Sequence, residues 1–152
     1  MTEPHFLRFL SWTKASHLAA LEGLLALVAA SIAIRALPFR SVAGLASRWG
    51  QSRRLSHDAQ DARVRMCCWA IEEWARRVPW KTVCFQKGLA LQMMLRRRRV
   101  ASTLHYGIAQ TGAAGLRAHV WISVGGEVVL GGQTVAEFAC LATFPATEAP
   151  GT

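Results

Sequence analysis

The stretch VPWKTVCFQKGLALQMMLRRRRV, residues 78–100, predicts a helix that carries a cysteine in its first turn. Pro79 ends the helical segment before it, because the proline ring and the missing N–H cannot continue a helix. The sequence from about Val83 through the four arginines 96–99 then reads as a helix, and cations are favoured at a helix C-terminus. We therefore expect Cys84 at a helix N-terminus.

Cys84 is placed where a thiol can become a nucleophile. Thiolate is the reactive form of cysteine, and a helix N-terminus and a nearby cation both lower a thiol pKa. The helix dipole and Lys81 are the two local sources of positive charge, and first-turn N–H groups could hold an oxyanion. Most free cysteines are packing residues, however, so position alone does not make Cys84 catalytic.

The other three cysteines have simpler interpretations. Cys67 and Cys68 fall in the middle of a helical pattern, on its apolar face, and Cys140 in EFACLATF reads as a small core residue. The four cysteines include no CxxC and no metal-type spacing, and an adjacent pair is awkward for an internal disulfide. We expect a reducing cytosol, no metal site and, without a secretory signal pattern, a cytoplasmic protein.

Helical patterns precede residue 78. Residues 58–77 place apolar side chains on one face and carboxylates in the first turn, which is typical of an amphipathic helix. Residues 19–37 are nearly all apolar, but the charge-free part is shorter than the roughly 20 residues of a membrane span. This pattern favours a buried helix, with membrane-surface contact as the alternative. Residues 39–54 read as a short helix and a basic linker.

After residue 100 the apolar pattern alternates with period two. Residues 102–110, 116–124 and 127–132 read as strands, and the Gly125–Gly126 pair is a hairpin signal. We expect an α+β fold, in which N-terminal helices are followed by an antiparallel sheet of three or four strands. The polar residues 146–152 read as a disordered tail.

Length and charge limit the function classes. The 152 residues suit one domain, and the 52% apolar composition argues against a disordered chain. Eighteen Lys and Arg against nine Asp and Glu give a net charge of +9, which attracts anionic partners. Nucleic acid, an anionic membrane and an acidic peptide all satisfy this demand, so charge does not choose among them. No phosphate-binding glycine loop is present.

A cysteine nucleophile needs a base, and two histidines follow the cysteine helix. His105 in TLHYG and His119 in AHVWISV both lie on predicted strands, which we expect to pair with each other. His119 shares a strand face with Trp121, two residues further on. Spacing does not decide between the two histidines.

The segments quoted above, together with LHYGI, AHVWISVGGEVVLGG, PFR (38–40) and FACLATFP (138–145), resemble the transglutaminase-like cysteine proteases of lasso-peptide biosynthesis, the microcin-processing B proteins. The resemblance covers most of the chain and implies a transglutaminase-like, papain-like fold. It makes residues 56–145 the protease core and residues 1–55 an apolar helix and basic linker packed on it. It also implies that Cys84 is the nucleophile and that His119, not His105, is the base.

The same resemblance implies the function. It is removal of a leader peptide from a ribosomally made precursor, before an asparagine-synthetase-like cyclase closes the lactam ring. Family members often carry a leader-recognition domain, for which residues 1–60 lack the strand pattern, so we expect a separate recognition protein. ATP dependence is implied by the family alone, and no bound cofactor is evident.

The third member of the catalytic triad departs from the family pattern, which places an aspartate about one hairpin after the histidine. The sequence there is VLGGQT, residues 129–134. A two-residue turn pairs Val124 with Glu127, so that His119 faces Gly132 with Gly131 beside it, and neither glycine has a side chain to offer. Three alternatives remain open: Gln133 redirected by a bulge, a backbone carbonyl or water, or one of the chain's two aspartates, Asp58 and Asp61.

Two other functions stay open at this point. A protease fold without its carboxylate could be a non-catalytic peptide-binding or scaffold module. The basic charge and the apolar helix would also suit a nucleic-acid or membrane-surface binder, although nucleic acid is the partner we expect least.

Overall fold

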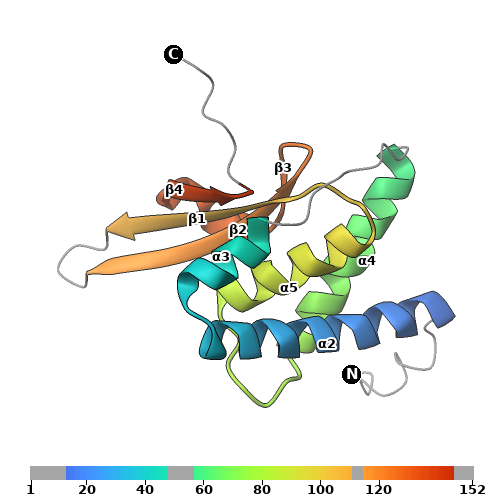
Figure 1. Ribbon diagram of the computed structural model, residues 1–152. Coiled ribbons are helices and arrows are strands. Elements are labelled where there is room, and N and C mark those ends of the chain that lie inside the picture. The colour runs from blue at the N-terminus through green and yellow to red at the C-terminus, as the bar shows by residue number, and fades with distance from the viewer. Residues whose placement is uncertain (1–12, 48–56, 111–114, 146–152) are drawn as a thin grey trace, which may run out of the picture.

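The computed structural model describes residues 13–47, 57–110 and 115–145, so the predicted tail and most of the basic linker lie outside the described residues. Within these ranges the chain forms helices first and strands second (Figure 1). The helices are α2 (Lys14–Ala36), α3 (Phe39–Ser47), α4 (His57–Ala75) and α5 (Cys84–Arg97). The strands are β1 (Thr103–Gln110), β2 (Leu116–Val124), β3 (Glu127–Leu130) and β4 (Ala139–Phe144), with the short 3-10 helix η2 (Gly132–Glu137) before β4.

The fold is α+β, as the sequence predicted. The four strands form one antiparallel sheet in the order β3-β2-β1-β4, and the α-helices pack on one face of it (Figure 1). Helix α5 lies directly against β1 and β2, and α2 and α4 pack on α5 from the other side. The FACLATF segment supplies the fourth strand. The Cys84 helix thus lies between α2 and the sheet, while α3 and α4 also touch the edge strands β4 and β3.

Close packing fixes α5 on the sheet. Its residues Leu89, Leu91 and Leu95 are fully buried, and a side chain at Gly88 would meet the Val120 side chain at 2.7 Å. Helices α2 and α4 approach each other similarly, because a Cβ at Gly23 would lie 3.1 Å from the Ala70 Cβ. Burial of such apolar side chains is the main stabilising contribution to a domain of this size. The start of α5 is therefore held rigidly relative to β2.

The third strand differs from the prediction. Val124 pairs with Glu127 as expected, but a register shift follows, so that Ile122 pairs with Leu130 and the strand ends there. A β-bulge inserts one residue into one strand and changes what every later residue faces. The prediction that His119 faces Gly132 across a continuous hairpin was therefore wrong.

Helix α2 has two different faces. Its small residues Ala19, Gly23, Ala26 and Ala30 are buried against the other helices, as the buried-helix interpretation requires. The opposite face exposes large apolar side chains to solvent, and α2 is long and apolar enough to cross a membrane by length and composition alone. The helix is thus a core element on one side only.

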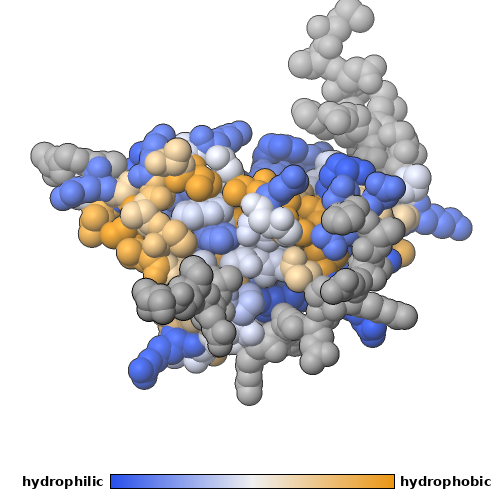
Figure 2. All heavy atoms as spheres, turned by 90° about the horizontal axis from the view of Figure 1, so that it is seen from above, coloured by the Kyte–Doolittle hydropathy of each residue, from blue (hydrophilic) through white to orange (hydrophobic). Residues whose placement is uncertain are grey.

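The sheet face away from the helices is not covered by any of the four α-helices. Figure 2 looks onto it from above, and apolar residues gather over the strands at the left of the view, with hydrophilic residues at the margins. Leu116 and Leu141 are the largely exposed leucines of the strands. Because side chains alternate along a strand, the residues next to the buried Leu104, Val120 and Ile122 point to this outer face.

Candidate active site

The first turn of α5 is held by a side chain of its own. The Val83 N–H donates to the Oε1 atom of the buried Gln86 at 3.0 Å, which is half of a capping box. The N–H groups of Cys84, Phe85 and Gln86 have no intrahelical acceptor, because the first residues of any helix lack one. Cys84 is half-buried at this end of the helix, as the sequence predicted. The local arrangement offers a thiol beside free N–H donors.

Cys84 and His119 line one cavity of about 730 Å³. It lies between the middle of α4, the start of α5 and the edge of the sheet where β3 ends. The other lining residues are Cys68 and Glu72 of α4, Thr82 and Lys87 near the start of α5, Val120 of β2, and residues 128–134. An ion pair of 3.5 Å joins Lys87 and Glu72. The two residues that the sequence analysis proposed as nucleophile and base therefore line the same cavity.

A main-chain carbonyl holds the His119 ring. The distance from His119 Nε2 to the Gly131 carbonyl oxygen is 2.8 Å. A carbonyl oxygen only accepts hydrogen bonds, so Nε2 carries the proton and donates it, and Nδ1 keeps its lone pair. Fixing the tautomer is the task of the third residue in a catalytic triad. Of the alternatives that the sequence left open, a backbone carbonyl is the group that contacts the His119 ring in the structure.

Gly131 is required where it stands. Its φ is +76°, and a Cβ there would lie 2.7 Å from the Val120 carbonyl oxygen and 3.2 Å from the Trp121 Cα. Only glycine adopts such a backbone conformation without strain and allows so close an approach. The resemblance described above implies an aspartate near this position. The structure needs a residue without a side chain here, because the chain turns tightly against β2.

His119 lies on the outer face of the sheet and reaches the cavity around its edge. Its neighbour Val120 points to α5, so alternation turns the imidazole the other way. The ring packs on Phe138 and Trp121, with centroid distances of 5.0 Å and 6.1 Å. No hydrogen bond joins it to Cys84 in this structure. Catalytic hydrogen bonds are often long in a free enzyme and tighten when substrate binds.

The remaining candidates do not join this pair. Gln133 lines the cavity but is exposed, and Asp58 and Asp61 on the first turns of α4 are not part of the lining. Burial raises the pKa of Cys67 to about 11 and that of Cys68 to about 12, so both thiols stay protonated and unreactive. No group of three or more metal-ligating side chains occurs in the described ranges.

His105 has a separate set of contacts. Its Nε2 is hydrogen-bonded to Ser123 Oγ at 2.7 Å, and its ring stacks on Trp121 at 5.3 Å. Its Nδ1 lies 3.9 Å from the Sγ of Cys140, which is exposed on β4. The interpretation of Cys140 as a core residue was therefore wrong. Sequence spacing gave no sign of this pair, because the two residues meet only through the pairing of β1 with β4.

Replacing Gly131 with alanine tests the role of this turn. We expect a loss of about 1–3 kcal/mol in the free energy of unfolding, from backbone strain and the contact with Val120. The His119 ring should also lose its fixed acceptor. Urea unfolding measures the first effect. Gly126 is the matched control, because its φ of +89° carries the same strain while its Cβ would meet nothing within 4 Å. An equal loss in both variants would show that the close approach to β2 does not matter.

Comparison with known proteins supplies one match. The sequence profile of the transglutaminase-like superfamily matches residues 24–143, which include α5, the residues that line the cavity, strands β1 to β3 and all of β4 except Phe144. No curated protein and no solved structure matches the chain.

Proposed function

Because this chain belongs to the transglutaminase-like superfamily, we propose that it is a cysteine peptidase that removes the leader peptide from a lasso-peptide precursor. The observation that carries the proposal is that Cys84 and His119 line one cavity. The superfamily includes cysteine proteases, and the specific substrate rests on the resemblance of the motifs around Cys84 and His119.

The proposed mechanism assigns one task to each group. His119 Nδ1 takes the proton of the Cys84 thiol as sulfur attacks the scissile carbonyl, and a C–S bond forms. The free N–H groups at the start of α5 stabilise the resulting oxyanion. His119 then gives its proton to the leaving amine as the C–N bond breaks. Water, activated by the same imidazole, releases the leader acid and restores the thiol. The Gly131 carbonyl keeps Nε2 protonated throughout.

The cavity suits an extended peptide segment. A volume of about 730 Å³ falls within the roughly 300–1,000 Å³ of ordinary ligand pockets. Its wall offers hydroxyl and amide groups from Thr82, Thr134 and Gln133, and opposite charges from Lys87 and Glu72. Such groups can bind main-chain amides and polar side chains on both sides of a scissile bond.

The proposed partners are the precursor peptide, a separate leader-recognition protein and an asparagine-synthetase-like cyclase. The test incubates the purified chain with precursor and recognition protein, with and without ATP, and follows leader loss by mass. We expect a free leader and a free core peptide. An intact precursor under all conditions would contradict the proposal. The proposal also requires genes for a small precursor and such a cyclase beside the gene for this chain.

A non-catalytic peptide-binding module is the second candidate function. It is favoured by two observations, the absence of a hydrogen bond between Cys84 and His119 and the lack of a carboxylate at Gly131. This module would bind the precursor and leave it uncut, and replacing Cys84 would not change the affinity. Isothermal titration beside the cleavage assay separates the two functions.

We further propose that α2 rests on an anionic membrane surface. Its solvent-exposed apolar residues Leu18, Leu21, Leu25, Ala29 and Ile32, here called the α2 stripe, follow one another at helical spacing. Lys14 and Arg35 are exposed cations at its two ends, whereas Arg97 in the groove beside it is ion-paired with Glu22 at 3.4 Å. An apolar stripe with flanking cations is the pattern of an interfacial helix. Because the other face of α2 is packed in the core, we expect the helix to lie along the surface.

Substituting the α2 stripe tests this contact. Leu21→Glu and Leu25→Glu together should weaken binding to phosphatidylglycerol vesicles by more than about tenfold, since each buried leucine contributes about 1.5–3 kcal/mol. Vesicle co-sedimentation is the measurement. Leu116→Glu is the matched control, because Leu116 is 71% exposed on β2, away from the stripe. Equal binding by all variants, or a wild-type dimer in sedimentation that the stripe variants lose, would contradict the membrane contact.

A further inference from the structure

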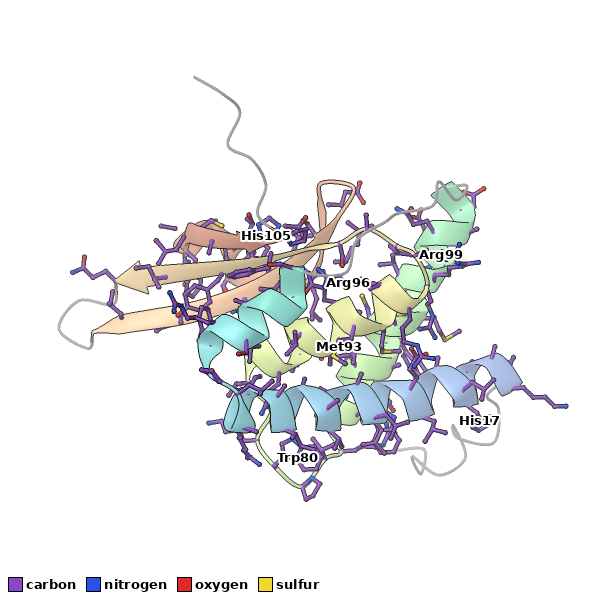
Figure 3. All side chains as sticks on the ribbon, in the orientation of Figure 1. His17, Trp80, Met93, Arg96, Arg99 and His105 are labelled. Carbon is purple, nitrogen blue, oxygen red and sulfur yellow. The ribbon has the colours of Figure 1, made fainter. Side chains whose placement is uncertain are left out.

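A cysteine–histidine contact lies on the outer face of the sheet, and neither of its residues lines the proposed peptidase cavity. Cys140 Sγ is 3.9 Å from His105 Nδ1 and 3.6 Å from the Ala142 carbonyl oxygen, so two acceptors surround one thiol proton. Cys140 belongs to β4 and His105 to the adjacent β1. Figure 3 shows His105 in the strand layer. The contact joins a solvent-exposed sulfur to a histidine on a rigid element.

His105 is held in the orientation that a base needs. Its Nε2 pairs with Ser123 Oγ at 2.7 Å, and its ring lies parallel to that of Trp121, with an interplanar angle of 2°. When Ser123 accepts the Nε2 proton, Nδ1 presents its lone pair to the thiol. The ring is only partly exposed, and burial lowers the pKa of His105, so that its neutral form prevails at neutral pH. The neutral form is the one that accepts a proton.

The four cysteines differ in access to solvent. Cys67 is buried, Cys68 and Cys84 are half-buried, and Cys140 is exposed. The pKa values of Cys67 and Cys68 are raised by burial, which keeps these thiols protonated. Cys140 therefore combines solvent exposure with a neighbouring base, a pairing that neither of those two thiols has.

We propose that Cys140 is an oxidation site for small hydroperoxides, with His105 as its acid–base group. His105 Nδ1 takes the thiol proton as sulfur attacks one peroxide oxygen, the O–O bond breaks, and the proton passes to the departing oxygen. With hydrogen peroxide the products are a Cys140 sulfenic acid and water, so that sulfur is oxidised and the peroxide is reduced. The oriented histidine supplies the proton that a hydroxide leaving group needs.

The test uses the full chain carrying Cys84→Ala, which removes the cavity thiol as a competing nucleophile. The chain is treated with hydrogen peroxide, sulfenic acid is trapped with dimedone, and the adduct is mapped by mass. We expect Cys140 to be labelled well before Cys67 and Cys68, and faster in the native chain than in urea. His105→Gln should slow labelling by about a hundredfold, the lower end of the range for acid–base assistance.

Two further variants distinguish assistance by His105 from simple exposure of the Cys140 thiol. Ser123→Ala leaves the His105 ring in place but frees its tautomer, so we expect a smaller slowing, while His17→Gln on α2 should change nothing. If Cys140 reacts no faster in the native chain than in urea, or equally fast with and without His105, it is merely exposed and the proposal fails. The outcome is independent of peptidase activity, because labelling needs neither a precursor nor Cys84.

Discussion

Replacing Cys84 with alanine is expected to abolish leader removal, lowering kcat/KM by at least about 10⁴-fold. The proposed reaction forms a covalent bond to the Cys84 sulfur, and no other group in the cavity can replace it. Cys68 lines the same cavity, but burial raises its pKa to about 12, and its Sγ donates to the Val129 carbonyl oxygen at 3.5 Å. Cleavage followed by mass spectrometry measures the loss.

Cys140→Ser is the matched control for this experiment. Cys140 lies next to His105, and it is exposed on β4, outside the residues that line the cavity. Cys140→Ser should cleave the precursor at the wild-type rate. If Cys140→Ser loses activity while Cys84→Ala keeps it, the nucleophile is on the outer face of the sheet and the assignment of the cavity is wrong.

The boundaries of helices and strands were predictable where they depend only on residues close together in the sequence. Pro79 and the hairpin glycines Gly125 and Gly126 mark chain boundaries through their backbone geometry, and the helices and strands lie close to the expected positions. The placement of Cys84 at a helix start followed from the same rules. Its role did not, because a helix N-terminus exists with or without a base across the cavity.

The surroundings of the two histidines were not predictable, because they depend on strand register. One extra residue in β3 ends the strand at Leu130 and turns the Gly131 carbonyl toward His119. A shift of one residue moves every later side chain to the opposite face, and sequence spacing carries no mark of it. The contact of His105 with Cys140 similarly needs the pairing of β1 with β4, which adds a second register shift.

The two faces of α2 show a related limit. Its composition could indicate either a buried helix or a membrane-surface helix, and in the structure one face is buried and the other exposes apolar side chains. Gly23 and the alanines around it permit close packing on α4, while the leucines of the α2 stripe stay in solvent. An almost uniformly apolar helix has too little polar sequence to indicate which side is covered.

Replacing His119 with alanine should lower kcat/KM by about 10³-fold, in the range that a general base contributes. His105→Ala should cost less than about tenfold, although both rings stack on Trp121 and removal of either leaves space beside the indole. The comparison is informative because sequence spacing left the two histidines equal. In the structure, His119 lines the cavity with Cys84, whereas His105 is paired with Ser123 and Cys140 outside it.

The pH profile separates catalysis from packing in these two variants. If His119 is the base, wild type and His105→Ala share one pH profile of kcat/KM, and His119→Ala lacks one limb of this profile and retains only slow cleavage. If His105 is the base instead, the limb disappears with His105→Ala. Equal losses in both variants with unchanged profiles would mean that each ring only supports Trp121. In that case neither histidine takes the thiol proton, and the superfamily fold would serve peptide binding in this chain.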